Sequence, residues 1–167
     1  LPDALARNAT TRTLRIWCAA VSTGQEAYSL AMILDEMAPR LSGWKIDIVG
    51  TDISDTVLDK AKAGLYSQFE IQRGLPVQML LKYFSQEGEQ WRISEKIRAM
   101  VSLQTLNLLS DTSRLGQFDV IFCRNVLIYF DIETKAQALA ALARRLKPDS
   151  TLFLGAAETV IGISEAL

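Results

Sequence analysis

The stretch RIWCAAVSTGQEAYSLAMIL, which spans Arg15–Leu34, decides the fold of this chain. It begins with an apolar run and continues into a loop of small residues, Ala19–Gly24. Beyond the loop, apolar residues recur every three or four positions, which predicts a helix over 25–38. A strand, a tight turn and a helix in this order are typical of open α/β sheets. In such sheets the small side chains of the turn let a ligand approach the backbone, and the first turn of the helix offers N–H groups.

The rest of the chain continues this alternation. We expect strands over 14–19, 45–50, 118–123 and 151–154, and helices over 25–38, 54–63 and 132–146, followed by an irregular tail. The alternation predicts an α/β fold with a Rossmann-like, doubly wound, mostly parallel sheet. Residues 65–102 differ, because Pro76 begins a short helix, SQEGEQ resembles a hairpin turn, and WRISEKIRAMVSLQT alternates as strands do. We interpret 65–102 as a small β-rich insertion in a single domain, 1–167.

Composition and charge narrow the possible functions. The 167 residues carry a formal net charge of −1 with scattered basic residues, so we expect no nucleic-acid partner. No apolar run reaches the roughly 20 residues that a membrane-spanning helix needs, so we expect no membrane insertion. The chain contains no histidine and two cysteines, Cys18 and Cys123, which excludes an imidazole base and argues against a disulfide or a metal site. Cysteines in predicted buried strands favour a reducing compartment.

The loop AAVSTG and its surroundings predict a class of ligand. The loop has one glycine, whereas the dinucleotide fingerprint needs three, so a pyrophosphate ligand is weakly supported. A ligand with an adenosine part and no phosphate, such as S-adenosylmethionine, needs less glycine, although any strand–helix turn favours Ser, Thr and Gly. Glu26 is either stabilised by the helix dipole or placed to contact the ligand. Asp52 either binds a ribose or caps the next helix, for which Ser54 is better placed.

Further polar residues follow the most apolar predicted strand, 118–123. Arg124 and Asn125 come directly after it, and Tyr129 lies close behind. They therefore lie at the carboxyl edge, where α/β sheets bind ligands. The Arg124 guanidinium matches a carboxylate, which could belong to the amino-acid end of S-adenosylmethionine, to an acidic substrate or to a neighbouring helix. Asn107, which follows another strand-like run, either contacts an adenine edge or closes a turn.

Five stretches together resemble a known family, the CheR-type chemotaxis methyltransferases. They are WCAAVSTGQEAYSLA, GTDISDTVLDKAKAGLY, LLKYF, TLNLL and FCRNVLIYFD, and they occur in the family's order and spacing over nearly the whole chain. Members of this family use S-adenosylmethionine to methylate glutamate side chains of bacterial chemoreceptors, which leaves S-adenosylhomocysteine. The resemblance implies a cytoplasmic enzyme whose partner is the cytoplasmic domain of a chemoreceptor, and we expect it to act as a monomer.

The resemblance also implies roles for individual residues. Tyr129 would face the substrate and help to place its carboxylate, and Arg124 is assigned to catalysis as well as to cofactor binding. The insertion 65–102 matches the family's β-subdomain, which helps to dock receptors. The residues implied to line the cofactor pocket are Ala20, Glu26, Asp52, Asn107, Leu108, Cys123 and Arg124.

The chain departs from the family pattern in three places. It opens at LPDAL, beyond the family's N-terminal helical domain and the TxFFR-like linker whose arginine reaches the active site, so we expect a fragment without those groups. The family tail reads GHSE or similar, whereas this chain has Gly155-Ala156-Ala157-Glu158. The turn SQEGEQ is short compared with members that hold a receptor's C-terminal pentapeptide, so we do not expect such binding.

Two other functions remain open. Methyl transfer to a carboxylate needs no general base, because glutamate is ionised at neutral pH, and this agrees with a chain that lacks histidine. Another S-adenosylmethionine enzyme would act on RNA or a small molecule, but the chain has neither a basic stripe nor an Asn/Asp-Pro-Pro-aromatic motif. The second alternative is a domain that binds cofactor or receptor without catalysis, which the missing N-terminal groups favour.

Overall fold

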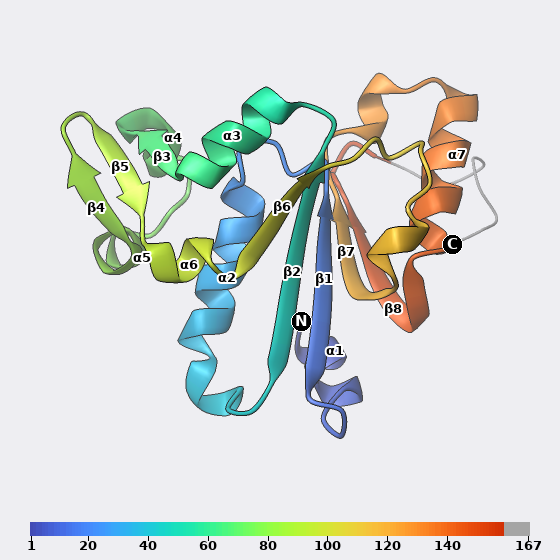
Figure 1. The fold of residues 1–167 in the computed structure, drawn as a ribbon, viewed down its shortest axis with the longest axis horizontal. Coiled ribbons are helices and arrows are strands. Elements are labelled where there is room, and N and C mark those ends of the chain that lie inside the picture. Colours follow the sequence, from blue (N-terminus) through green and yellow to red (C-terminus); the bar gives the residue numbers. More distant parts are fainter. Residues whose placement is uncertain (159–167) are drawn as a thin grey trace.

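The computed structural model describes residues 1–158 of the chain. In this part, five strands form a main sheet in the order β6-β2-β1-β7-β8, and every neighbouring pair is parallel (Figure 1). The fold is therefore α/β with a parallel sheet, as the alternation of elements predicts. The strands are β1 (Thr13–Ala19), β2 (Lys45–Asp52), β6 (Val101–Thr105), β7 (Phe118–Cys123) and β8 (Leu146–Leu154).

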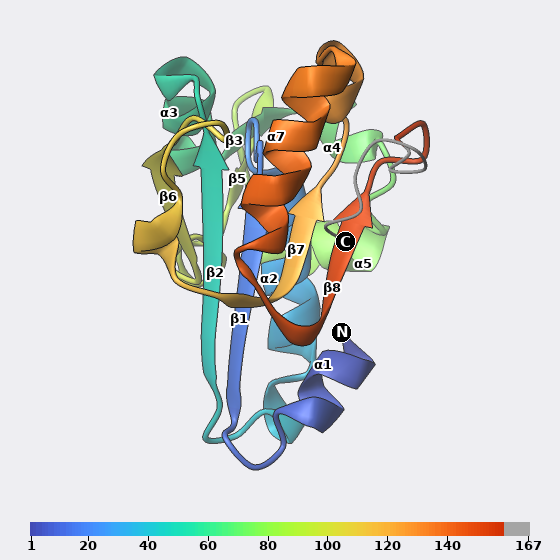
Figure 2. The ribbon, with the colours of Figure 1, turned by 90° about the vertical axis from the view of Figure 1, so that its right-hand side faces the viewer.

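Helices cover both faces of the main sheet. Alternate residues of its central strands face opposite ways, so each strand packs against helices on both sides. Ile16 of β1 packs into the core cluster that contains α2 (Gln25–Glu36), whereas Trp17 packs into the cluster that contains α7 (Ile132–Ala143). Both side chains are fully buried. Figure 2 shows α7 in front of the sheet. It also shows α1 (Pro2–Arg7), a helix that the sequence pattern does not predict, beside the amino ends of the strands.

Helix α3 (Asp55–Ala63) forms where the sequence predicts it. The Ser54 hydroxyl accepts a hydrogen bond from the Val57 backbone N–H at 3.5 Å, and Gly64 ends the helix in the left-handed conformation at φ 63°. A serine N-cap is a standard start signal of a helix, and a glycine beyond the last turn is a standard stop signal. The cap of α3 is thus Ser54, as expected.

A second, antiparallel sheet lies beside the main one, in the order β3-β5-β4. Figure 1 shows it at the far side of α2 from β7 and β8. Between other elements of residues 1–158 lie three 3₁₀ helices, η1 (Ala38–Arg40), η2 (Ser113–Leu115) and η3 (Leu127–Tyr129). The small sheet and its helices comprise β3 (Leu65–Ser67), α4 (Gln68–Gln72), α5 (Val77–Tyr83), β4 (Phe84–Glu87), β5 (Gln90–Ile93) and α6 (Glu95–Arg98).

The expectation that WRISEKIRAMVSLQT forms only strands is wrong. Residues 95–98 form α6, and β6 pairs with β2 in the main sheet, so the expected insertion boundary at 102 falls inside a main-sheet strand. Ile93 and Ile97 are both fully buried. A spacing of four residues keeps side chains on one face of a strand and also on one face of a helix, so the pattern alone does not separate the two.

Three element boundaries also differ from those expected. Helix α2 ends at Glu36, and η1 follows it in place of the predicted last turn. Helix α7 ends at Ala143, and β8 begins at Leu146 instead of 151, with a register shift that accommodates the residues around Pro148. Proline has no N–H for a hydrogen bond between strands, so the pairing of β8 with β7 shifts register there and continues beyond it. Of the expected irregular tail, residues 159–167 lie outside the described residues.

No helix within residues 1–158 combines the length and the apolar character that spanning a bilayer requires.

Candidate functional site

The topology brings the candidate residues to one place. From β1 the chain builds outward through β2 and β6, and it then returns to build β7 and β8 on the other side of β1. The ends of β1 and β7 are register partners at Ala19 and Cys123. Figure 1 shows the loops that leave these strands at the same edge of the sheet as the loops after β2 and β6. Such a switch point at the carboxyl edge is where open α/β sheets bind ligands.

The loop after β1 has an unusual backbone. Ala20 and Ser22 have left-handed φ values of 60° and 53°, and Gly24 has φ 92°. A left-handed conformation costs an alanine or a serine roughly 1–2 kcal/mol, so the surrounding structure must hold it. The Val21 N–H donates to the Thr51 carbonyl at 2.8 Å, and the Ser22 N–H donates to Asp52 Oδ2 at 2.9 Å. The loop is therefore fixed in a conformation that turns its backbone groups toward the sheet edge.

Asp52 joins two loops of this edge. Its Oδ2 accepts the hydrogen bond from Ser22, and its Oδ1 accepts one from the Ser54 N–H at 3.0 Å. The carboxylate thus links the loop after β1 to the start of α3. Each carboxylate oxygen can accept two hydrogen bonds, so both oxygens retain the capacity to accept a hydroxyl donor such as a ribose diol.

Glu26 and Arg124 form an ion pair across the edge, with 2.8 Å between Arg124 Nη1 and Glu26 Oε2. Of the three partners that the sequence leaves open for Arg124, the structure contains the neighbouring helix. The Arg124 side chain is 49% exposed and the Glu26 side chain is 26% exposed, and a pair this exposed contributes little to stability. The pair therefore leaves a positive and a negative group side by side and accessible, which suits a zwitterionic ligand.

Cys123 and Asn107 are placed differently. Cys123 is completely buried, and burial raises the pKa of its thiol to about 12, so the thiol is neutral. Asn107 Oδ1 accepts a hydrogen bond from the Leu109 N–H at 2.9 Å, which is the turn-closing role. Leu108 packs against the core cluster on the α7 face, which includes Cys123.

Tyr129 ends the short helix η3 and is 80% exposed. The neighbouring Ile128 is 43% exposed. A tyrosine normally buries most of its ring, so this side chain is available to a partner molecule.

Glu158 is a residue of this edge to which the sequence analysis assigns no role. Its carboxylate accepts hydrogen bonds from the backbone N–H groups of Asn125, Val126 and Leu127 at 3.0, 2.9 and 2.7 Å, and of Gly155 at 2.6 Å. Burial alone would raise the pKa of this group, but the four donors outweigh it and lower the pKa below its ordinary value. The acid shared between GAAE and the family's GHSE is the signal that could have identified it.

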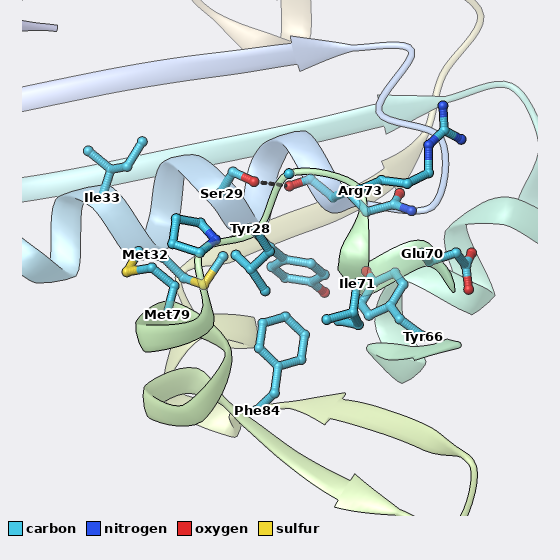
Figure 3. Close-up of a pocket in the computed structure, with 14 residues that line it drawn as sticks. Tyr28, Ser29, Met32, Ile33, Tyr66, Glu70, Ile71, Arg73, Met79 and Phe84 are labelled. Atoms are coloured by element: carbon cyan, nitrogen blue, oxygen red, sulfur yellow. Dashed lines mark hydrogen bonds between the residues drawn. The ribbon is translucent and has the colours of Figure 1, made fainter. Parts of the chain in front are cut away.

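A cavity of about 600 Å³ lies elsewhere, between α2 and the helices of the small sheet (Figure 3). None of the predicted cofactor residues lines it. Tyr66 closes its end nearest the site, because the Tyr66 hydroxyl donates to the Thr23 carbonyl at 2.7 Å. The cavity is predominantly apolar, with side chains that include Met32, Ile71, Met79 and Phe84. The Glu26–Arg124 ion pair and the left-handed residues Ala20, Ser22 and Asn125 lie instead at the carboxyl edge of the main sheet.

Comparison with known proteins decides the family. A family model described as CheR methyltransferase, SAM binding domain, matches residues 1–167. The chain belongs to this CheR family. It is 44% identical over 164 residues to chemotaxis protein methyltransferase 1 of Pseudomonas aeruginosa, covering 96% of this chain and 60% of that protein. It is 39% identical over 168 residues to a chemotaxis protein methyltransferase of Vibrio anguillarum, covering 99% and 60% of the two proteins.

Solved structures agree on the fold. The CheR chain matches PKMT2 from Rickettsia typhi in complex with AdoHcy, with a TM-score of 0.54 and 19% identity over 86% of this chain and 21% of that one. It also matches the glycopeptide N-methyltransferase MtfA complexed with sinefungin, with a TM-score of 0.53 and 10% identity over 92% and 47% of the two chains. The cofactor of the CheR domain is S-adenosylmethionine, as the sequence predicts. The chain spans about 60% of the length of the curated relatives it matches.

Proposed function

We propose that this CheR domain is the catalytic domain of a protein-glutamate O-methyltransferase. Its substrate would be glutamate side chains on the cytoplasmic domain of a methyl-accepting chemotaxis receptor, and its products glutamyl methyl esters and S-adenosylhomocysteine. The proposed location is the cytoplasm, where those receptor domains lie. The observation that carries the proposal is the convergence of Asp52, the Glu26–Arg124 pair and the exposed Tyr129 at one sheet edge.

The residues at this edge fit S-adenosylmethionine. Asp52 offers carboxylate oxygens to the ribose hydroxyls, and the exposed Glu26–Arg124 pair offers one charge of each sign to the amino-acid end of the cofactor. The small side chain of Ala20 leaves the backbone of the first loop accessible. Cys123, Leu108 and Asn107 complete the walls. No phosphate-binding glycine cluster is needed, which agrees with the single glycine in AAVSTG.

The task of the protein in this reaction is to position the methyl donor and the substrate carboxylate. When bound, S-adenosylmethionine supplies a methyl group that a carboxylate oxygen accepts directly as the carbon–sulfur bond breaks. A substrate glutamate has an ordinary pKa of about 4.3 and is already ionised, so a chain without histidine lacks nothing for this step. Tyr129 donates one hydrogen bond to the substrate carboxylate and leaves its other oxygen free. Correct alignment of two reactants contributes roughly 7–11 kcal/mol to such reactions.

A second candidate is a domain that binds cofactor or receptor and does not catalyse transfer. The observation that favours it is that the chain covers only 60% of the length of its relatives, so groups outside this chain could complete the active site in those proteins. The two candidates share the same cofactor site. They differ in what happens to the receptor.

The test incubates the chain with methyl-labelled S-adenosylmethionine and the cytoplasmic fragment of a chemoreceptor. We expect alkali-labile label in the receptor, because methyl esters of glutamate hydrolyse in base. Calorimetry with S-adenosylhomocysteine runs in parallel, with Asp52→Ala as the variant that binds the cofactor more weakly, and a pull-down measures binding of the receptor fragment. Cofactor binding without label in the receptor would support the second candidate. Absence of cofactor binding would overturn the first candidate, and absence of both cofactor and receptor binding would overturn both.

A further inference from the structure

We propose that Glu158 is a positioning residue for the substrate side of the site. Its carboxylate fixes the segment Asn125–Tyr129, which carries the tyrosine that the proposed function assigns to the substrate. The role of the segment in catalysis rests on that proposed function. The fixing of the segment by Glu158 rests on the contacts alone.

The contacts concentrate on one short piece of backbone. Three consecutive N–H groups, those of Asn125, Val126 and Leu127, donate to the two oxygens of Glu158 at 2.7 to 3.0 Å. Consecutive N–H groups converge in this way when one residue is left-handed, and Asn125 has φ 59°. The backbone therefore forms an anion-binding nest, and the protein's own carboxylate fills it.

The carboxylate is the polar anchor of a segment whose apolar side chains Val126 and Leu127 pack against the core on the α7 face. The chain leaves β7 at Cys123, turns through a left-handed residue, and reaches η3, whose last residue is Tyr129. Leu127 is buried, but Ile128 and Tyr129 on either side of the tip are exposed. Without the carboxylate, three donors would lose their common acceptor, and the left-handed turn at Asn125 would lose the interaction that offsets its strain.

Gly155 lets the carboxylate approach. A Cβ added to this glycine would lie 2.7 Å from Glu158 Oε2 and 2.9 Å from the Asn125 backbone nitrogen. Both distances are shorter than atoms tolerate, and the nitrogen belongs to the backbone. A methyl group at 155 would therefore push the carboxylate away from the nest without removing it from the protein. This provides a second way to break the same contact.

The test compares Glu158→Gln, which keeps the shape of the side chain, with Gly155→Ala, which displaces it. The matched control is Asp111→Asn, because Asp111 also accepts a backbone hydrogen bond, from the Ser113 N–H at 2.8 Å, in a different loop. The readouts are amide hydrogen exchange of residues 125–127, affinity for S-adenosylhomocysteine, and kcat for receptor methylation.

We expect both nest variants to speed exchange of the 125–127 amides and to lower kcat about tenfold, the lower end for losing a hydrogen bond to a charged group. Affinity for S-adenosylhomocysteine should change less than about threefold, because Glu26 and Asp52 lie on other segments and the side chain of Arg124 is held by Glu26, not by Glu158. The double variant should lose little beyond either single one, since both break one interaction. The Asp111→Asn control should match wild type in all three readouts.

The failure of this proposal differs from that of the proposed function. A wild-type protein that binds cofactor and never labels the receptor contradicts the proposed function, while faster amide exchange in Glu158→Gln still supports the anchor. Unchanged exchange of the 125–127 amides in both variants overturns the anchor. A wild-type rate of methylation in both variants overturns the positioning role, whatever the exchange result.

Discussion

The two edges of the main sheet treat their charges in opposite ways. At the amino edge, Asp119 is 4% exposed and accepts hydrogen bonds from the Arg15 backbone N–H and from Lys147 Nζ, both at 2.8 Å. The Arg15 guanidinium pairs with Asp47 at 2.8 Å and donates to the Leu115 carbonyl at 3.0 Å. These groups face one another and tie four strands together.

At the carboxyl edge the same kinds of groups are left accessible. The Glu26–Arg124 pair is open to solvent, and Tyr129 is 80% exposed. Of the five non-glycine residues with positive φ in the described part of the chain, three lie in loops of this edge, namely Ala20, Ser22 and Asn125. Removing a buried, hydrogen-bonded charge such as Asp119 leaves its partner unpaired and destabilises the fold, whereas the Glu26–Arg124 pair and Tyr129 are accessible to a ligand. The comparison therefore assigns stability to one edge and binding to the other.

The largest expected effect breaks the amino edge. Asp119→Ala should lower the free energy of unfolding by about 3 kcal/mol, near the lower end for a broken buried pair, because Lys147 is partly exposed and regains water. Urea denaturation measures this. Asp47→Ala, in the half-exposed pair of the same edge, should cost under about 1 kcal/mol. Equal losses in the two variants would mean that burial does not separate them.

The next effect concerns cofactor binding at opposite ends of one strand. Asp52→Ala should weaken binding of S-adenosylhomocysteine by about 1–3 kcal/mol, the scale for losing hydrogen bonds to a charged group. Asp47→Ala removes a carboxylate from the other end of β2 and should leave the affinity unchanged. Calorimetry on both variants provides the comparison. An unchanged affinity in Asp52→Ala would refute its role with the ribose.

A smaller effect separates catalysis from binding within the carboxyl edge. Tyr129→Phe should slow methyl transfer about tenfold, because the substrate carboxylate loses one hydrogen-bond donor. Affinity for S-adenosylhomocysteine should be preserved. Rates of receptor labelling and calorimetry measure the two quantities. If both fell together, the tyrosine would be a packing residue of the edge.

The smallest effect is confined to acid. Burial opposes ionisation of Asp119, but Lys147, Asn8 and the Arg15 N–H outweigh it and lower its pKa below the ordinary value. Its stabilising contribution is therefore complete above about pH 4, the unfolded pKa, and is lost as pH falls through the depressed folded pKa. The stability difference between wild type and Asp119→Asn should shrink as the pH falls below about 4. A constant difference would contradict the shifted pKa.

Much of the fold could be predicted from the sequence, because the signals are local. The apolar run 118–123 forms β7, and the cap Ser54 lies directly before α3. The insertion was harder, since the spacing of Ile93 and Ile97 suits a strand and a helix alike. Only the tertiary structure separates the helix from the strand, because residues 95–98 form α6 and β6 pairs with β2 in the main sheet.

The site divides along the same line. Asp52 ends β2 and Arg124 directly follows β7, so the carboxyl-edge rule places them. The partner of Arg124 could not be chosen, because Glu26 lies 98 positions away and competes with a ligand for the same guanidinium. Glu158 was missed for a related reason. Three of its four hydrogen bonds exist only because β8 lies beside β7, so that the end of one strand meets the loop of the other.

The most direct test of the two-edge account is a structure of this chain with S-adenosylhomocysteine. The account predicts that the ligand lies over the carboxyl ends of β1 and β7, with its sugar on Asp52 and its amino-acid end at Glu26 and Arg124. A ligand found in the apolar cavity between α2 and α5, with the carboxyl edge closed by the protein's own side chains, would contradict it.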